Sequence, residues 1–131
     1  MDHTFLVTKG QKLVELLDAT PVKPQAALWV HSPDNDRWKL WIVPDRSMKN
    51  KRAFYQIVAE TIGASEYLTG LDASSTEFVH EEHPAIQSMR KTIRVSGISE
   101  VHFSANMLNG YYLPESIVLR MDRAKQSPAA A

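Results

Sequence analysis

The chain has 131 residues, no cysteine, a formal net charge of zero and 44% hydrophobic residues. This length and composition are typical of one globular domain with its own core, and the lack of cysteine excludes disulfides, thiolate catalysis and cysteine-bound zinc. The start, Met1-Asp2-His3-Thr4, is acidic where a signal peptide is basic, and no apolar run approaches the length of a membrane span. We therefore expect a cytoplasmic protein without a membrane partner.

Thr8-Lys9-Gly10-Gln11 has the pattern of a capping box, so we predict a first helix with Thr8 as its N-cap and Gln11 reaching back to it. Leu13, Leu16 and Leu17 give this helix an apolar stripe. The helix should end before Pro21, because the residue before a proline is disfavoured in helical conformation.

Residues 26–31 and 37–43 are rich in strand-forming side chains, and the turn-forming segment Ser-Pro-Asp-Asn-Asp separates them. A loop of two residues at 34–35 or of four at 33–36 gives the same hairpin register, in which Trp29 faces Leu40, Ala27 faces Ile42 and His31 faces Trp38. One face of this hairpin is then almost wholly apolar and should be core. The other face carries Trp41 beside Arg37 and Lys39, so we expect it to be only partly covered.

After Pro44, Ser47 is predicted to cap a second helix of about sixteen residues. Its buried stripe comprises Phe54, Ile57, Val58, Thr61 and Ile62.

Residues 77–80 are predicted to form a short strand, and Pro84 suits the first position of a third helix with Ile86, Met89 and Ile93 inward. A strand is predicted at 99–105. Asn109-Gly110 is a strong hairpin signal that should return the chain to a last strand at 117–121, either at a sheet edge or beginning after Pro114.

The predicted fold class is therefore α+β (mixed α/β), with a mixed sheet of about five strands, two hairpins and three helices in the order α-ββ-α-β-α-ββ. Two helical crossovers, at 48–62 and 84–94, should each make neighbouring strands parallel. We expect one globular domain over residues 1–124 and a disordered tail over 125–131.

Charge is distributed in blocks along the chain. Residues 1–36 carry −2, residues 37–52 carry +5, residues 53–89 carry −6 without any Lys or Arg, and residues 90–131 carry +3. Opposite blocks either lie together and neutralise each other, or they form a dipolar surface whose basic end meets an anionic partner.

The segment 29–52 holds all three tryptophans and six of the fifteen Lys and Arg residues. Cations are normally disfavoured at a helix N-terminus, yet they crowd the start of the second helix, where free backbone N–H groups also attract anions. We therefore predict a non-catalytic binding module whose basic surface recognises an anionic protein or nucleic acid. The predicted binding residues are Lys39, Trp41, Arg46, Lys49 and Arg52. The competing interpretation is that the tryptophans are core and the cations are simply solvated.

Two alternatives remain open. The first is a small enzyme with an unknown reaction and a cleft formed by His80, Glu82, His83 and His102. The second is a homodimer in which the acidic block of one chain meets the basic block of another. No cofactor or metal site is predicted, because His80 and His83 are three residues apart and precede a proline, whereas the helical zinc motif needs histidines four apart.

Overall fold

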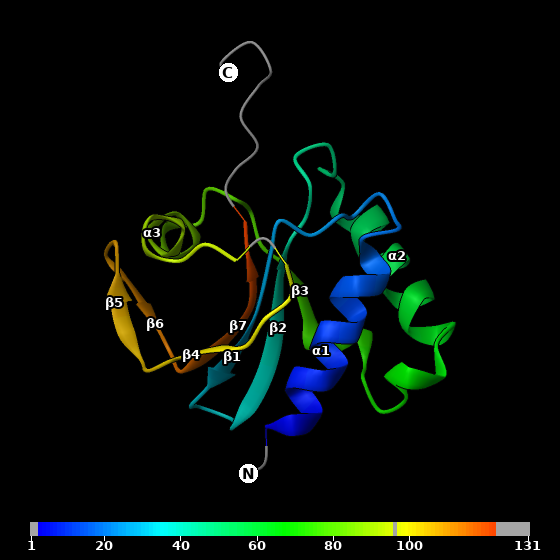
Figure 1. Ribbon diagram of the computed structural model, residues 1–131, viewed down its shortest axis with the longest axis horizontal. Helices are drawn as coiled ribbons and strands as arrows, with labels where there is room; N and C mark the ends of the chain where they lie inside the picture. The colour runs from blue at the N-terminus through cyan, green and yellow to red at the C-terminus, as the bar shows by residue number, and fades with distance from the viewer. Residues whose placement is uncertain (1–2, 96, 123–131) are drawn as a thin grey trace.

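The computed structural model describes residues 3–95 and 97–122 (Figure 1). It confirms the mixed α+β fold. In chain order the elements are α1 (Thr4–Leu17), β1 (Ala26–Ser32), β2 (Arg37–Val43), α2 (Lys51–Gly63), the 3-10 turns η1 (Glu66–Leu68) and η2 (Ala73–Ser75), β3 (Thr76–Phe78), α3 (Pro84–Thr92), β4 (Val101–Phe103), β5 (Asn106–Leu108), β6 (Tyr111–Leu113) and β7 (Ser116–Met121). The predicted tail at 125–131 lies outside the described residues.

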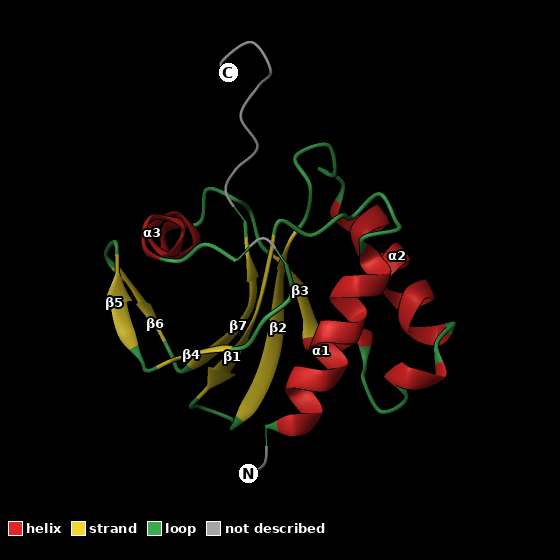
Figure 2. Ribbon diagram, viewed as in Figure 1, coloured by secondary structure: helices red, strands yellow, loops and turns green. Residues whose placement is uncertain are grey.

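Five strands form one sheet in the order β3-β2-β1-β7-β4, and β5 pairs with β6 in a separate two-stranded sheet. Figure 2 shows α1 and α2 on one side of the large sheet, with α3 and the β5–β6 hairpin on the other. Each side therefore has its own hydrophobic core, because alternate residues of a strand point to opposite faces.

The β1–β2 hairpin has the predicted register, with Trp29 opposite Leu40, and its loop is the four-residue alternative. Its second face is only partly covered, as predicted, because Leu28, Val30, Trp41 and Val43 are buried whereas Arg37 and Lys39 are exposed. The inner sides of α3 and of the small hairpin cover the buried part of this face. Sequence periodicity identifies an apolar helix face but not the sheet face that it will cover.

Two predicted helix starts are wrong. α1 begins at Thr4 rather than after Thr8, and the Gln11 side chain donates to the Ser99 carbonyl instead of closing a capping box. α2 begins at Lys51, where the Asn50 side chain accepts a hydrogen bond from the Ala53 amide. Ser47 lies three residues before this N-cap, and its backbone amide and its hydroxyl both donate to Asp45 Oδ2. The predicted start of α3 at Pro84 is correct.

One predicted crossover is correct and the other is wrong. Helix α2 connects β2 to β3, which are parallel neighbours. β4 does not join β3, however, but pairs antiparallel with β7 at the opposite edge of the sheet. Asn109 and Gly110 form the expected tight turn with φ of 53° and 81°, yet this turn links β5 to β6 rather than reaching the last strand directly. β7 begins after Pro114, as one predicted alternative required, and it lies inside the sheet.

Candidate functional site

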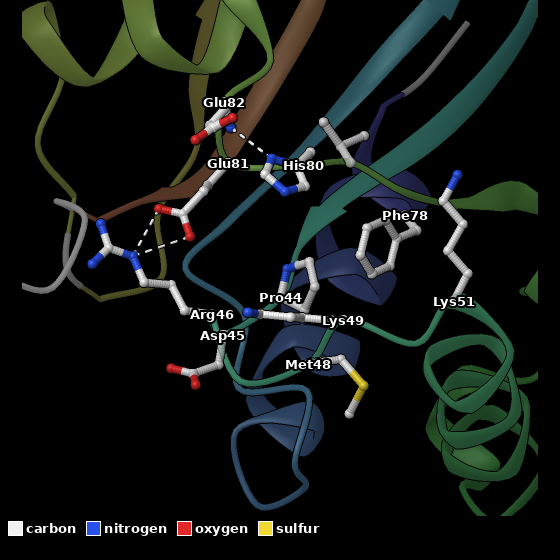
Figure 3. A pocket seen from close by; sticks show the side chains of 11 residues that line it. Pro44, Asp45, Arg46, Met48, Lys49, Lys51, Phe78, His80, Glu81 and Glu82 are labelled. Carbon is white, nitrogen blue, oxygen red and sulfur yellow. Dashed lines mark hydrogen bonds and ion pairs between the residues drawn. The ribbon is translucent and has the colours of Figure 1, made fainter.

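The β2-α2-β3 crossover places several polar side chains around one cavity. β2 and β3 run in parallel, so their carboxyl ends lie side by side, and the chain leaving β2 enters α2 through residues 44–50. A cavity of about 630 Å³ lies here, and we call it the β2–β3 pocket (Figure 3). Its polar lining consists of Asp45, Arg46, Lys49, Lys51, His80, Glu81 and Glu82. Open α/β sheets commonly bind ligands at this end of their strands.

The cations of the pocket have different environments. Arg46 Nε donates to both oxygens of Glu81, at 2.9 and 3.1 Å. Lys49 and Lys51 form no ion pair with any described residue, and the Lys51 amine lies 5.7 Å from the centre of the Phe78 ring. In Figure 3 the Lys49 side chain extends along the pocket toward Arg46, while Lys51 rises on the opposite side. The two lysines are therefore the cations most available to a ligand.

A second arginine lies behind Glu81. The Arg90 side chain is only 9% exposed, and its Nη1 is 3.8 Å from Glu81 Oε1. Arg90 Nη2 donates to Gln25 Oε1 at 2.7 Å, and Gln25 Nε2 in turn donates to the Pro44 carbonyl at 2.8 Å. These bonds fix the guanidinium beside the wall of the pocket.

Arg90 has fewer acceptors than its charge requires. Its Nε and Nη1 atoms are buried and have no hydrogen-bond partner. Burial is the largest influence on this group and lowers the pKa of Arg90, with the nearby Arg46 charge acting in the same direction against Glu81 and Asp122. An arginine stays charged even so. Glu81 is thus the carboxylate that lies between two guanidiniums, and the Nε and Nη1 of Arg90 are buried behind it without an acceptor.

The other predicted binding residues do not line this pocket. Lys39 is half exposed on β2, and its amine lies 3.9 Å from Glu77 Oε1. Trp41 is 7% exposed and packs edge-on against the rings of His83 and Tyr111. Arg52 is exposed on α2, one residue beyond Lys51, and is not among the lining residues. The structure therefore brings together Arg46 and Lys49 but separates them from Lys39 and Trp41.

The four side chains of the predicted enzyme cleft do not share one cavity. His80 and Glu82 line the β2–β3 pocket, and His80 Nδ1 accepts a hydrogen bond from the Glu82 amide. His83 packs between Trp41 and Tyr111, whereas His102 lies on the edge strand β4 and pairs with Glu100 at 2.6 Å. Within residues 3–95 and 97–122, no three His, Asp or Glu side chains form a group that could hold a metal ion.

The acidic and basic blocks meet in two places. Lys39 pairs with Glu77, and Arg46 pairs with Glu81. Each contact joins residues 37–52 to residues 53–89, so the two blocks neutralise each other in part. The remaining positive charge is concentrated where α2 begins.

Sequence reasoning missed two residues of the site. Lys51 belongs to the cations at the start of the second helix but was not among the predicted binding residues, yet it lines the pocket. Arg90 was not considered, although it follows Ile86 by four residues and therefore shares the inward face of the third helix. A charged residue on an apolar helix face is a signal that the sequence does contain.

Comparison of the chain with models of protein families, with curated proteins and with solved structures found no match. In the described part of the chain, no helix is both long and apolar enough to cross a membrane.

Proposed function

We propose that this protein is a small binding module, without catalytic activity of its own, that recognises an oxyanion of a partner in the β2–β3 pocket. The partner's phosphate or carboxylate group would lie among Arg46, Lys49 and Lys51, near the first turn of α2. The single observation that carries this proposal is the position of Lys49 and Lys51. Both line the cavity at a helix N-terminus without an ion pair to any described residue.

Two further features support an anion rather than a neutral ligand. The first turn of α2 contains no acidic residue. Its backbone N–H groups and its cations therefore both attract a negatively charged ligand. The unsatisfied Arg90 donors beside Glu81 add a third source of positive potential. A carboxylate or phosphate oxygen is the acceptor that a guanidinium binds best.

Glu81 has a specific role in this proposal. Its carboxylate already accepts from Arg46 and lies 3.8 Å from Arg90 Nη1, which is the kind of position that a ligand's oxyanion would take. It therefore competes with the ligand for Arg46, which lines the pocket. A partner with more than one anionic oxygen would displace it more readily than a single carboxylate.

The test is affinity purification from cells that naturally contain the protein, comparing the wild type with Lys49→Glu. We expect the variant to lose its partners while remaining folded, since an acidic residue near a helix N-terminus does not destabilise the helix. Lys91→Glu is the matched control, because it reverses one exposed lysine on α3, away from the pocket. Equal recovery of the same partners by all three proteins would refute the proposal.

The homodimer alternative predicts a different behaviour. If residues 53–89 of one chain met residues 37–52 of another, the dimer would dissociate as salt rises, because exposed charge contacts are screened. Light scattering at low and high salt separates the two proposals. A binding module of the kind proposed here keeps one mass at both salt concentrations.

A further inference from the structure

A second cavity lies on the other half of β2, where the predicted residues Lys39 and Trp41 are found. It has a volume of about 620 Å³, within the range of small-molecule sites. Its lining includes Arg37, Lys39, Trp41, Ser74, Tyr111 and Tyr112. We call it the Trp41 cavity. It shares no lining residue with the β2–β3 pocket.

Strand geometry explains the order of side chains in this cavity. Arg37, Lys39 and Trp41 are every second residue of β2, so their side chains project from the same face of the sheet. Successive Cα atoms in this series are about 7 Å apart. Arg37 and Lys39 are exposed, whereas Trp41 lies at the start of the buried half of the strand. The sheet face is thus apolar where α3 and the hairpin cover it and cationic where they do not.

The two cations of the Trp41 cavity, Arg37 and Lys39, are available to bind an anionic ligand. The Arg37 side chain forms no ion pair with any described residue. The contact between Lys39 and Glu77 is 3.9 Å long and involves two half-exposed side chains, so it contributes little. Asp34 is the one acidic residue among those lining the cavity, against two permanent cations. The cavity therefore has a positive balance.

Aromatic side chains, among them those of Trp41, Tyr111 and Tyr112, also line the Trp41 cavity. Trp41 and Tyr111 pack edge to face with ring centres 6.2 Å apart, and both line the cavity. Tyr112, on the following position of β6, lines the same cavity and is 55% exposed. A large aromatic side chain that remains exposed beside cations offers a stacking surface to a flat ring. The hydroxyl of Ser74 adds a hydrogen-bonding group on the side of η2.

From this combination we infer that the Trp41 cavity binds a nucleotide, with its base stacked on Tyr112 and its phosphate held by Arg37 and Lys39. An aromatic ring that carries an oxyanion is the ligand chemistry that matches both walls. The nucleotide is either free or part of a single strand, since both present the same base and phosphate. This site is separate from the proposed oxyanion site at the β2–β3 pocket.

Intrinsic fluorescence tests this inference, because Trp38 and Trp41 line the cavity whereas Trp29 is buried in the opposite core. The probes are thymidine monophosphate and an oligothymidylate of about ten nucleotides. We expect quenching by at least one probe. Comparable affinities indicate a free nucleotide, and much tighter binding of the oligonucleotide indicates a single strand. Absence of quenching by either probe would overturn the inference.

Matched variants locate the binding. Tyr112→Ala should weaken the affinity about tenfold, the typical loss of one stacked base, whereas Tyr67→Ala, at another exposed tyrosine, should not. Arg37→Gln should weaken binding and reduce the slope of log affinity against log salt by about one, whereas Arg94→Gln should not. Equal affinities of Tyr112→Ala and the wild type, or equal quenching by polyglutamate, would contradict the assignment.

Discussion

Replacing Glu81 with glutamine should strengthen oxyanion binding in the β2–β3 pocket. The substitution keeps the shape of the side chain and an oxygen that can accept from Arg46, but it removes the negative charge next to both arginines. At an effective dielectric constant of 20 to 40, a charge about 6 Å from the bound anion repels it by roughly 1.5 to 3 kcal/mol. Salt reduces this to about 1 kcal/mol, so the affinity should rise about fivefold.

The same substitution should slightly destabilise the fold. Glu81 is the carboxylate closest to the buried Arg90 guanidinium, and it also pairs with the exposed Arg46. Loss of a surface pair costs less than 1 kcal/mol, and loss of a buried one costs several, so this intermediate case should cost about 1 to 2 kcal/mol. Glu81→Gln should therefore have a lower free energy of unfolding and a higher affinity for the oxyanion than the wild type.

Inorganic phosphate is the probe, and isothermal titration calorimetry at an ionic strength of about 0.15 M is the assay. Glu66→Gln makes the same charge change on an exposed residue outside the pocket and serves as the control. Glu81→Gln should bind phosphate about fivefold more tightly than either the control or the wild type. An unchanged or lower affinity in a folded Glu81→Gln protein would show that Glu81 does not compete with the ligand.

Three other predictions concern stability and pH. Arg52→Glu should raise the urea midpoint by an amount equivalent to about 0.5 kcal/mol, because the first turn of α2 has no acidic residue; a lower midpoint would argue against this dipole effect. Gly10→Ala should lower the free energy of unfolding, measured in urea, by about 2 kcal/mol, because the added Cβ would lie 2.5 Å from Trp29 Nε1. Alanine favours a helix over glycine, so a gain in stability would show that Trp29 can move away. Burial is the main cause that lowers the pKa of His83 below its ordinary 6.5. As the pH drops through 6.5, the unfolded chain therefore takes up the proton before the folded one does. The free energy of unfolding should fall until the pH reaches the folded pKa. Melting temperatures on either side of that pH should differ less in His83→Asn, which keeps an N-cap acceptor, and an identical pH dependence would exclude His83 as the cause.

The sequence predicts the β1–β2 hairpin well because its pattern has two independent sources. Alternation fixes which residues share a face, and the turn-forming residues at 33–36 fix the register, so Trp29 and Leu40 can be paired without a structure. Helix α3 is equally clear, because Pro84 marks its start and the apolar spacing marks its inner side. Such elements are determined by local rules.

Other features depend on contacts that no local pattern encodes. Ser47 is a good cap by composition, but Asp45 binds its amide and hydroxyl, and the start of α2 moves to Lys51. β4 crosses to the far edge of the sheet, which its three residues do not reveal.

Four of the predicted binding residues lie in two separate cavities because of the geometry of β2. Lys39 and Arg46 are seven residues apart along an extended strand and the loop that follows it, so they belong to opposite ends of β2 and to two different cavities. The sequence identifies the cations correctly as a cluster along the chain. It cannot show that the strand separates them in space.

The most direct test of anion recognition is a titration of the labelled protein with inorganic phosphate, followed by two-dimensional NMR of its backbone amides and arginine Nε groups. If the β2–β3 pocket binds an oxyanion, we expect saturable shifts at residues 49–53 and 79–82 and at the Nε of Arg46 and Arg90, and loss of these shifts in Lys49→Glu. Shifts that are absent, or that are confined to other surfaces and unaffected by Lys49→Glu, would contradict it.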